Sequence, residues 1–288
     1  MLLVAGALVT SNDAADSVPD WPLAYGKIIP PLVGGIRYEF AHRVLAALVA
    51  ILTTVLAIWL ARIESRRFVR RLGWTALGLV VAQALLGAGR VLFRHPPVIA
   101  TTHATVAQLF FLTTVALAVY TSAWSVREQP SLEDSGSPRV RFLTALTTVA
   151  ILIQLVLGAG FRHGAFGILP HIIGAVLLLG IVVWTAGAVK ARFGSVPELR
   201  RGVVLLHATF GAQVLLGIAA YWAVARAINE AQPSAPYVIL TVAHVFVGAL
   251  VLASSAFLTL ACFRRIRPVA SVAVPARAGA SRPARSGA

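Results

Sequence analysis

Residues 38–60 read YEFAHRVLAALVAILTTVLAIWL, and no charged residue follows Arg43 within them. As a helix this stretch is about 34 Å long at the usual rise per residue. The hydrocarbon core of a bilayer is about 30 Å thick and takes about 20 apolar residues per helix. The stretch therefore predicts a membrane-spanning helix, with a glutamate (Glu39) and a histidine (His42) near its first turn.

The rest of the chain repeats this apolar character. It is 58% hydrophobic and 12% charged, with a mean hydropathy of +0.84. These values exclude an ordinary soluble globular domain and favour an all-α integral membrane protein. Six further stretches are long enough to span a bilayer: 72–93, 98–124, 140–160, 169–188, 203–224 and 237–262.

The net charge of +15 reflects topology rather than nucleic-acid binding. Of the 25 Lys and Arg residues, 18 lie on one side of the predicted spans, in loops 61–71, 127–141 and 190–201 and in the tail from Arg264. By the positive-inside rule that side is cytoplasmic. The sequence thus predicts a multi-pass protein of the bacterial inner membrane, surrounded by lipid, with a cytoplasmic C-terminus and no nucleic-acid partner.

The first residues are apolar but short. Residues 1–9 span only about 14 Å as a helix, and no basic segment precedes them as in a signal peptide. We expect them to form the outer half of a first helix whose beginning is missing from this sequence, so that eight helices are intended. Cys262 is the only cysteine, which excludes an intramolecular disulfide.

Internal similarity divides the chain into two halves. AQALLGAG (82–89) matches AQVLLGIA (212–219), and LVAGALVT (3–10) matches LVLGAGFR (155–162). The matches occur in the same order, which indicates two pseudo-symmetric four-helix bundles in parallel orientation. The predicted units are an N-terminal half (1–124), a mobile cytoplasmic linker (125–139), a C-terminal half (140–263) and a disordered basic tail (264–288).

Four histidines occupy equivalent places in this repeat. His42 and His103 lie early in the second and fourth helices of the first half, and His171 and His244 match them in the second half. All four are predicted at one depth in the outer leaflet. Two imidazoles on facing helices suit the two axial positions of a heme iron. Zinc fits less well, because its sites use three or four protein ligands.

A single membrane histidine is often only an interhelical hydrogen-bond partner, but the recurrence of both pairs favours two bis-histidine heme sites. The remaining histidines fit this cluster less well. His207 is predicted near the cytoplasmic face, and His95 and His163 follow arginines in outer loops, where we expect them to be solvated.

Other polar residues lie near the predicted sites. Glu39, three residues before His42, is either a helix N-terminal carboxylate or an acid–base group beside a heme edge. Interhelical packing suffices to explain Gln83, Gln154 and Gln213, each four residues before a glycine. Five outer arginines are candidates for heme propionates or lipid headgroups: Arg43, Arg90, Arg94, Arg162 and Arg226.

These motifs resemble the heme A synthase family. The resemblance rests on GALVTSNDAADSVPDWPLAYG (6–26), EFAHR (39–43), AQALLGAGRV (82–91), TTHATVAQLFF (101–111), and the LPHIIGAVL and VAHVFVGALVL helices. It implies oxidation of a ring methyl of heme O to the formyl group of heme A, for terminal oxidase assembly. Heme O synthase and terminal oxidase subunits are then candidate partners, and electrons are exchanged with an external donor.

The resemblance also implies residue roles. His42 and His103 would bind the substrate heme O, Glu39 would be the catalytic carboxylate, and His171 and His244 would hold a heme b cofactor. The sequence departs from many members in lacking a cysteine pair in the first outer loop, which excludes a thiol-assisted step. The histidines alone equally permit a two-heme electron-transfer cytochrome without substrate chemistry, and a structural or transport protein is a third interpretation.

Overall fold

The computed structural model describes residues 1–94, 96–227 and 230–268 of the 288-residue chain. Almost all of this part is helical. In chain order, the elements are α1 (Leu2–Ser11), α2 (Ile36–Ile63), α3 (Arg67–Leu92), α4 (Pro97–Thr121), α5 (Ala123–Val126), β1 (Leu132–Asp134), α6 (Val140–Arg162), α7 (Leu169–Phe193), α8 (Pro197–Ala227), α9 (Ala235–Arg265) and β2 (Ile266–Pro268).

Within these residues, seven helices are long and apolar enough to cross a membrane: α2, α3, α4, α6, α7, α8 and α9. They correspond one to one with the seven predicted spans, so the all-α integral membrane fold is confirmed. Several helices extend beyond the apolar stretches. Hydropathy marks only the part of a helix inside the hydrocarbon core, and backbone hydrogen bonding continues past it. The apolar N-terminal segment forms α1, which has 10 residues.

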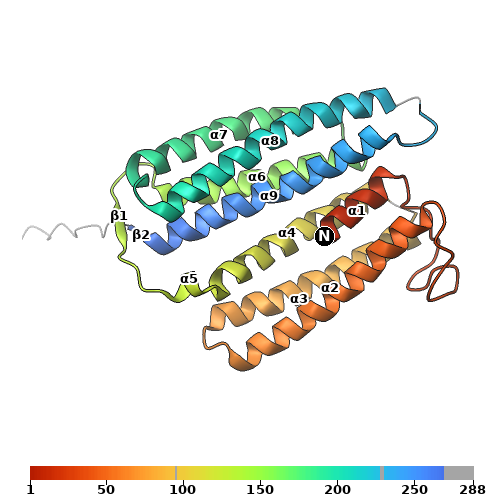
Figure 1. The fold of residues 1–288 in the computed structure, drawn as a ribbon, viewed down its shortest axis with the longest axis horizontal. Coiled ribbons are helices and arrows are strands. Elements are labelled where there is room, and N and C mark those ends of the chain that lie inside the picture. The colour runs from red at the N-terminus through yellow and green to blue at the C-terminus, as the bar shows by residue number, and fades with distance from the viewer. Residues whose placement is uncertain (95, 228–229, 269–288) are drawn as a thin grey trace, which may run out of the picture.

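The long helices form two groups that lie against each other (Figure 1). Helices α1 to α4 make one group and α6 to α9 the other. The groups meet where α9 packs on α1 and α4, and where α4 packs on α6. Half of the most apolar window of α9 is buried, compared with 28% or less in the other spans. Helix α9 is therefore the central element of the fold.

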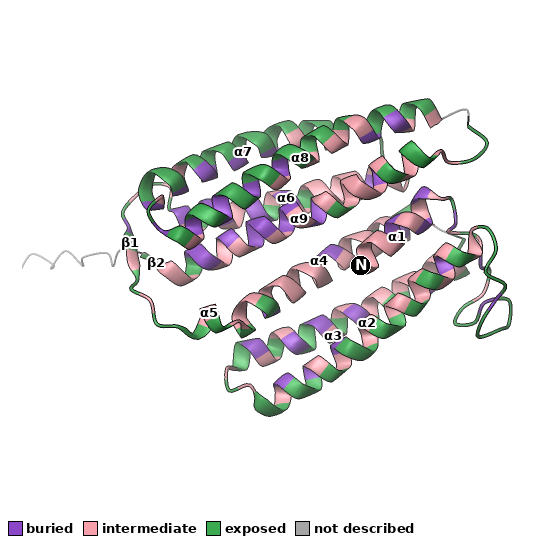
Figure 2. Cartoon of the chain, in the orientation of Figure 1, coloured by how far each residue is buried: buried purple, intermediate pink, exposed green. Residues whose placement is uncertain are grey.

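The outer surfaces of both groups are apolar. Exposed residues line the outward faces of the helices (Figure 2), and many are large hydrophobic side chains such as Leu52, Trp59, Leu177 and Leu215. A water-soluble protein does not expose contiguous apolar surface on this scale. This surface is suited to contact with lipid chains.

Hydroxyl groups link the helices inside the second group. Thr147 on α6 hydrogen-bonds Thr185 on α7 at 2.8 Å, and Thr148 on α6 hydrogen-bonds Ser255 on α9 at 2.8 Å. In a membrane the hydrophobic effect does not drive helices together, so short polar side chains and close packing take that role. Such bonds fix the relative register of α6, α7 and α9.

The linker is more ordered than its composition predicts. It carries the end of α5 and all of β1, and β1 pairs in parallel with β2, so that Leu132 lies opposite Ile266. Asp134 is buried and accepts hydrogen bonds from the amides of Val140 at 2.6 Å and Gly136 at 3.0 Å. The linker is held in place because these contacts satisfy its backbone, a long-range effect that composition does not reveal.

The start of the predicted disordered tail also has regular structure. Arg264 and Arg265 complete α9, and residues 266–268 form β2. Ile266 is completely buried, so the chain here contributes to the core. Residues 269–288, the rest of that predicted tail, lie outside the described residues.

Candidate functional site

Each of the four predicted ligand histidines lies against a glycine of the preceding helix. A Cβ atom at Gly6 would lie 3.3 Å from His42 Cε1, and one at Gly87 would lie 3.5 Å from His103 Cε1. In the second half the corresponding distances are shorter. An added Cβ would lie 2.9 Å from His171 Cε1 at Gly158, and 3.0 Å from His244 Cε1 at Gly217. The same arrangement thus occurs four times, and in each case glycine provides the space for an imidazole ring.

Three glutamines reinforce this arrangement one turn away from the glycines. Gln83 Nε2 donates to the backbone oxygen of His103 at 2.9 Å, and Gln154 Nε2 donates to that of His171 at 2.8 Å. Gln154 Nε2 also lies 3.0 Å from His171 Nδ1, and Gln213 Nε2 lies 3.3 Å from His244 Nε2. Three of the four histidine-bearing helices are thus tied to the helix before them.

In the second half, the two predicted ligands face each other. The ring centroids of His171 and His244 are 6.3 Å apart, and the ring planes are inclined at 83°. A metal–imidazole bond is about 2 Å long and a ring centre lies about 1.1 Å from its nitrogen, so two axial imidazoles on one iron have centroids about 6 Å apart. The separation of His171 and His244 fits this requirement.

The first-half pair has unsatisfied ring nitrogens. His42 and His103 interact electrostatically with each other and with Arg90. The Nδ1 atoms of both rings and the Nε atom of Arg90 are buried without a hydrogen-bond partner in the described part of the chain. Buried polar groups normally have partners. These unsatisfied donors and acceptors converge from α2, α3 and α4, as expected of a site for a polar or metal-containing ligand.

Glu39 is buried at the start of α2 beside this pair. Its Oε1 accepts a hydrogen bond from Arg43 Nη2 at 2.7 Å, and its Oε2 accepts one from the Val18 amide at 3.0 Å. Arg43 Nη1 in turn donates to the backbone oxygens of Asp20 and Leu23, at 2.8 and 2.9 Å. The Glu39–Arg43 pair therefore anchors the first outer loop (residues 12–35) to the start of α2.

The loop has its own internal structure. The Asp20 carboxylate accepts hydrogen bonds from the amides of Tyr25 at 2.6 Å and Gly26 at 2.8 Å. The Gly26 amide, followed by that of Tyr25, lowers the pKa of Asp20 below its ordinary value. Both donors have positive φ angles, 54° and 69°. The DWPLAYG motif thus forms a tight turn closed by its own aspartate.

The outer arginines separate into different settings. Arg162 on α6 donates to Ser11 Oγ of α1 at 2.6 Å, and Ser11 Oγ lies 2.9 Å from Thr241 Oγ1 of α9. Arg162 also interacts electrostatically with His244. Arg94 and Arg226 are both exposed. The Arg226 guanidinium also stacks over the Trp222 ring, 3.9 Å from its centroid. Arg90 and Arg162, together with Arg43 beside His42, are therefore the outer arginines that interact electrostatically with the histidine pairs.

His163 was expected to be solvated, and this prediction is wrong. The residue is partly buried between the two halves and interacts electrostatically with Arg90 and His103. Burial, with the charges of Arg90 and Arg162, lowers the pKa of His163 to about 4. Nothing in its local sequence indicates this contact, because it depends on how the halves meet. His207 is exposed on α8, and His95 lies outside the described residues.

Comparisons with known proteins agree with this arrangement. The COX15-CtaA family model, described as a cytochrome oxidase assembly protein, matches residues 38–169. The heme A synthase of Symbiobacterium thermophilum is 31% identical over 246 residues, which cover 74% of this chain and 78% of that protein. The heme A synthase of Shouchella clausii is 27% identical over a match that covers 66% of this chain and 73% of that protein. That of Alkalihalophilus pseudofirmus is 32% identical over 41% of each chain.

Proposed function

This chain belongs to the heme A synthase family, and we propose that it is the membrane oxidoreductase that converts the ring methyl of heme O to the formyl group of heme A. Family membership makes it an enzyme of heme A biosynthesis and confirms the resemblance of its motifs. The conversion removes four electrons from the ring methyl and adds one oxygen atom, so it needs an oxidant and a source of oxygen from outside the chain. The product serves terminal oxidase assembly, and heme O synthase supplies the substrate.

We assign the two histidine pairs to two hemes. His42 and His103 hold the substrate heme O, and His171 and His244 hold a heme b. The unsatisfied Nδ1 atoms of His42, His103 and His244 and the 6.3 Å separation of the second pair support this assignment. When bound, heme b supplies one-electron redox chemistry beside the substrate site.

Arg90 and Arg162 are the assigned propionate partners. Arg90 lies near the first pair with an unpartnered Nε, and Arg162 lies near His244. An arginine can bind a carboxylate through two parallel hydrogen bonds, which orients a planar ligand as well as binding it. Arg43 is already engaged by Glu39 and by loop carbonyls, so its role is to hold the loop.

Glu39 is the assigned acid–base group. Its Oε1 faces the Arg43 guanidinium, which disfavours a proton there, whereas the donor to Oε2 among the described residues is the neutral Val18 amide. A proton is therefore held and released at Oε2. The anchored outer loop covers the same end of the site, where it excludes water and fixes the carboxylate relative to the substrate.

The observation that carries this proposal is an asymmetry between otherwise matching halves. Both halves place two glycine-backed histidines on the second and fourth helices of their group, but only the first has a buried carboxylate three residues before its first histidine. The equivalent position in the second half is Ile168. We therefore locate the substrate chemistry in the first half. We also propose that the arginine-rich end of the bundle faces the cytoplasm of a bacterial cell.

The test is co-expression of this chain with a heme O synthase, followed by heme extraction and chromatography. Heme A is expected only in membranes that contain this chain. Glu39→Gln should abolish heme A formation while bound heme b remains, because glutamine still accepts the Val18 amide but cannot carry the proton. Glu64→Gln, which changes a carboxylate at the opposite end of α2, is the matched control and should form heme A normally.

Two results would contradict the proposal. Undiminished heme A formation by the Glu39→Gln variant would exclude its assigned role. Heme O persisting unchanged with normally folded, heme b-loaded protein would instead indicate electron transfer without substrate chemistry.

A further inference from the structure

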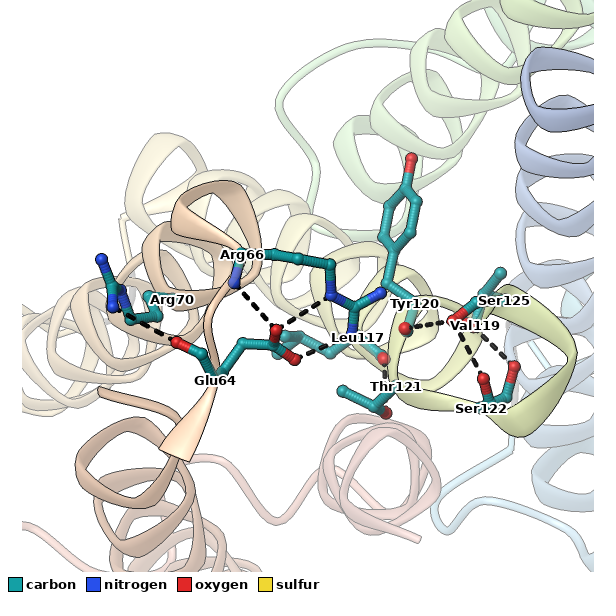
Figure 3. Close-up of polar contacts among 9 residues, drawn as sticks. All are labelled: Glu64, Arg66, Arg70, Leu117, Val119, Tyr120, Thr121, Ser122 and Ser125. Atoms are coloured by element: carbon teal, nitrogen blue, oxygen red, sulfur yellow. Dashed lines mark hydrogen bonds and ion pairs between the residues drawn. The ribbon is translucent and has the colours of Figure 1, made fainter. Parts of the chain in front are cut away.

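A second polar site lies at the opposite end of the bundle from the histidines. A cavity of about 440 Å³ opens between the start of α3, the end of α4 with α5, and the end of α9. Arg66, Tyr120, Trp124, Phe263 and Arg264 are among its lining residues. Figure 3 shows the α3–α4 side of this region, where Arg66 and Tyr120 lie close together above Glu64. We call this feature the inner cavity.

The inner cavity has an arginine that is held in place but incompletely bonded. Arg264 lies over the Trp124 ring, 4.5 Å from its centroid, and its Nη2 donates to the Arg127 backbone oxygen. Its Nη1 is buried and has no hydrogen-bond partner among the described residues. A buried guanidinium nitrogen without an acceptor is costly. The unsatisfied donor therefore indicates an anionic ligand.

Arg66 supplies a second donor on the facing side. Its Nε and Nη2 bind the two oxygens of Glu64 at 2.9 and 2.8 Å, as Figure 3 shows. This fork fixes the guanidinium, and its Nη1 makes no hydrogen bond to another described residue. Arg70 binds the Glu64 backbone oxygen at 3.2 Å and adds positive charge nearby. Arg264 also interacts electrostatically with Arg265 and Glu198. Four arginines therefore lie near two carboxylates, and the site remains positively charged.

The position of the inner cavity selects the kind of anion. It lies about 30 Å along α9 from His244, at the far boundary of the membrane. Two of its lining rings, Phe68 and Phe263, are 46% and 45% exposed, next to the apolar side chains Val119 and Leu260. A small soluble anion would leave these rings without an apolar partner. A phospholipid has both a phosphate for the arginines and acyl chains that can pack against the rings. Basic pockets between helices at this depth suit anionic headgroups.

We propose that the inner cavity binds the phosphate headgroup of an anionic phospholipid, with Arg264 and Arg66 as its ligands and the two phenylalanines against its acyl chains. The bound lipid bridges α3, α4 and α9, and so joins the two halves at the end opposite the histidines. This role is independent of the proposed heme chemistry.

Native mass spectrometry of the purified full chain in detergent tests this proposal, with phosphatidylglycerol as the added lipid. Phosphatidylglycerol should bind more tightly than phosphatidylcholine. Arg264→Gln should weaken that binding about ten-fold or more, because a charge-assisted hydrogen bond is lost. Arg201→Gln removes an exposed charge on α8 and, as the matched control, should leave binding unchanged.

A second variant separates loss of the site from loss of folding. Val119→Trp fills the inner cavity while keeping both arginines, and it should also weaken phosphatidylglycerol binding, with an unchanged helical circular dichroism spectrum. Equal binding of the two lipids, or equal effects of Arg264→Gln and Arg201→Gln, would overturn the proposal. Inorganic phosphate that displaced the lipid at equal concentration would instead identify a site for a soluble anion, and would overturn it as well.

Discussion

The contact between Gly158 and His171 predicts the outcome of a single added methyl group. A Cβ at position 158 would lie 2.9 Å from His171 Cε1 and 3.2 Å from Nδ1, and ordinary contact begins at 3.4 Å. The ring must therefore move by about 0.5 Å or more in Gly158→Ala. The contact of Gln154 Nε2 with His171 Nδ1, at 3.0 Å, opposes this movement of the ring.

The expected loss follows from packing. Overfilling a close-packed site costs about 1–3 kcal/mol, which corresponds to roughly 5- to 150-fold weaker binding of the ligand that needs the ring in place. The assay is the heme b content and Soret spectrum of the purified variant. Gly211→Ala is the control, because no described residue apart from its neighbours along the helix lies within 4 Å of a Cβ there, and alanine favours a helix over glycine.

The four glycines together give a graded test. The distances predict the largest heme loss for Gly158→Ala, followed by Gly217→Ala and Gly6→Ala, and almost none for Gly87→Ala, whose Cβ would make an ordinary contact at 3.5 Å. Full heme b occupancy in Gly158→Ala, or a Gly87→Ala effect as large as that of Gly158→Ala, would refute the reasoning.

Two further predictions concern the end of the bundle opposite the histidines. The side chain and amide of Arg66 lower the pKa of Glu64 from 4.5 to about 2, so the stabilisation is present above pH 4.5 and is lost as the pH falls towards 2. The melting temperature of Glu64→Gln should therefore fall less than that of the wild type over this window, and parallel curves would contradict the prediction. Asp134→Ala leaves the Val140 amide and Arg192 without their buried acceptor, at a cost of about 1–3 kcal/mol. Denaturant unfolding should show this loss, whereas the exposed neighbour Glu133→Ala should change stability little, and equal effects would argue against the buried bonds.

The spans were predictable because their signal is local. An unbroken apolar stretch such as 38–60 has one stable placement in a membrane, as a helix across it. The ends were less well predicted. Helix α8 begins at Pro197 and ends at Ala227, whereas its apolar stretch covers only 203–224, because charged residues such as Arg200 and Arg201 continue the helix outside the hydrocarbon core.

The site was predictable only in part. The repeat identified the four histidines, and it contained the glycines that now lie against them, but spacing alone did not show which side chain each glycine faces. The burial of His163 and the pairing of β1 with β2 were not predictable from local sequence. Both contacts join segments far apart in the chain, and hydropathy and periodicity carry no information about such contacts.

The two halves hold their histidines in the same way, each against a glycine of the preceding helix, and we call this arrangement the histidine frame. They differ in the outer segment that joins the first two helices of each half, which we call the cover. In the second half the segment between α6 and α7 is six residues long, from His163 to Ile168, and it offers no carboxylate. In the first half 24 residues lie between α1 and α2. They form a turn closed by Asp20, and hydrogen bonds to Glu39 and Arg43 hold them against α2. Because the histidine frame occurs in both halves, it can explain how each half would hold a ligand, but it cannot explain why a reaction would take place in only one of them. The anchored cover is the feature unique to one half, and Glu39 is part of both its anchor and the site. Under the proposed function, fastening the loop and transferring the proton are tasks of one carboxylate, which accounts for its burial with an arginine partner.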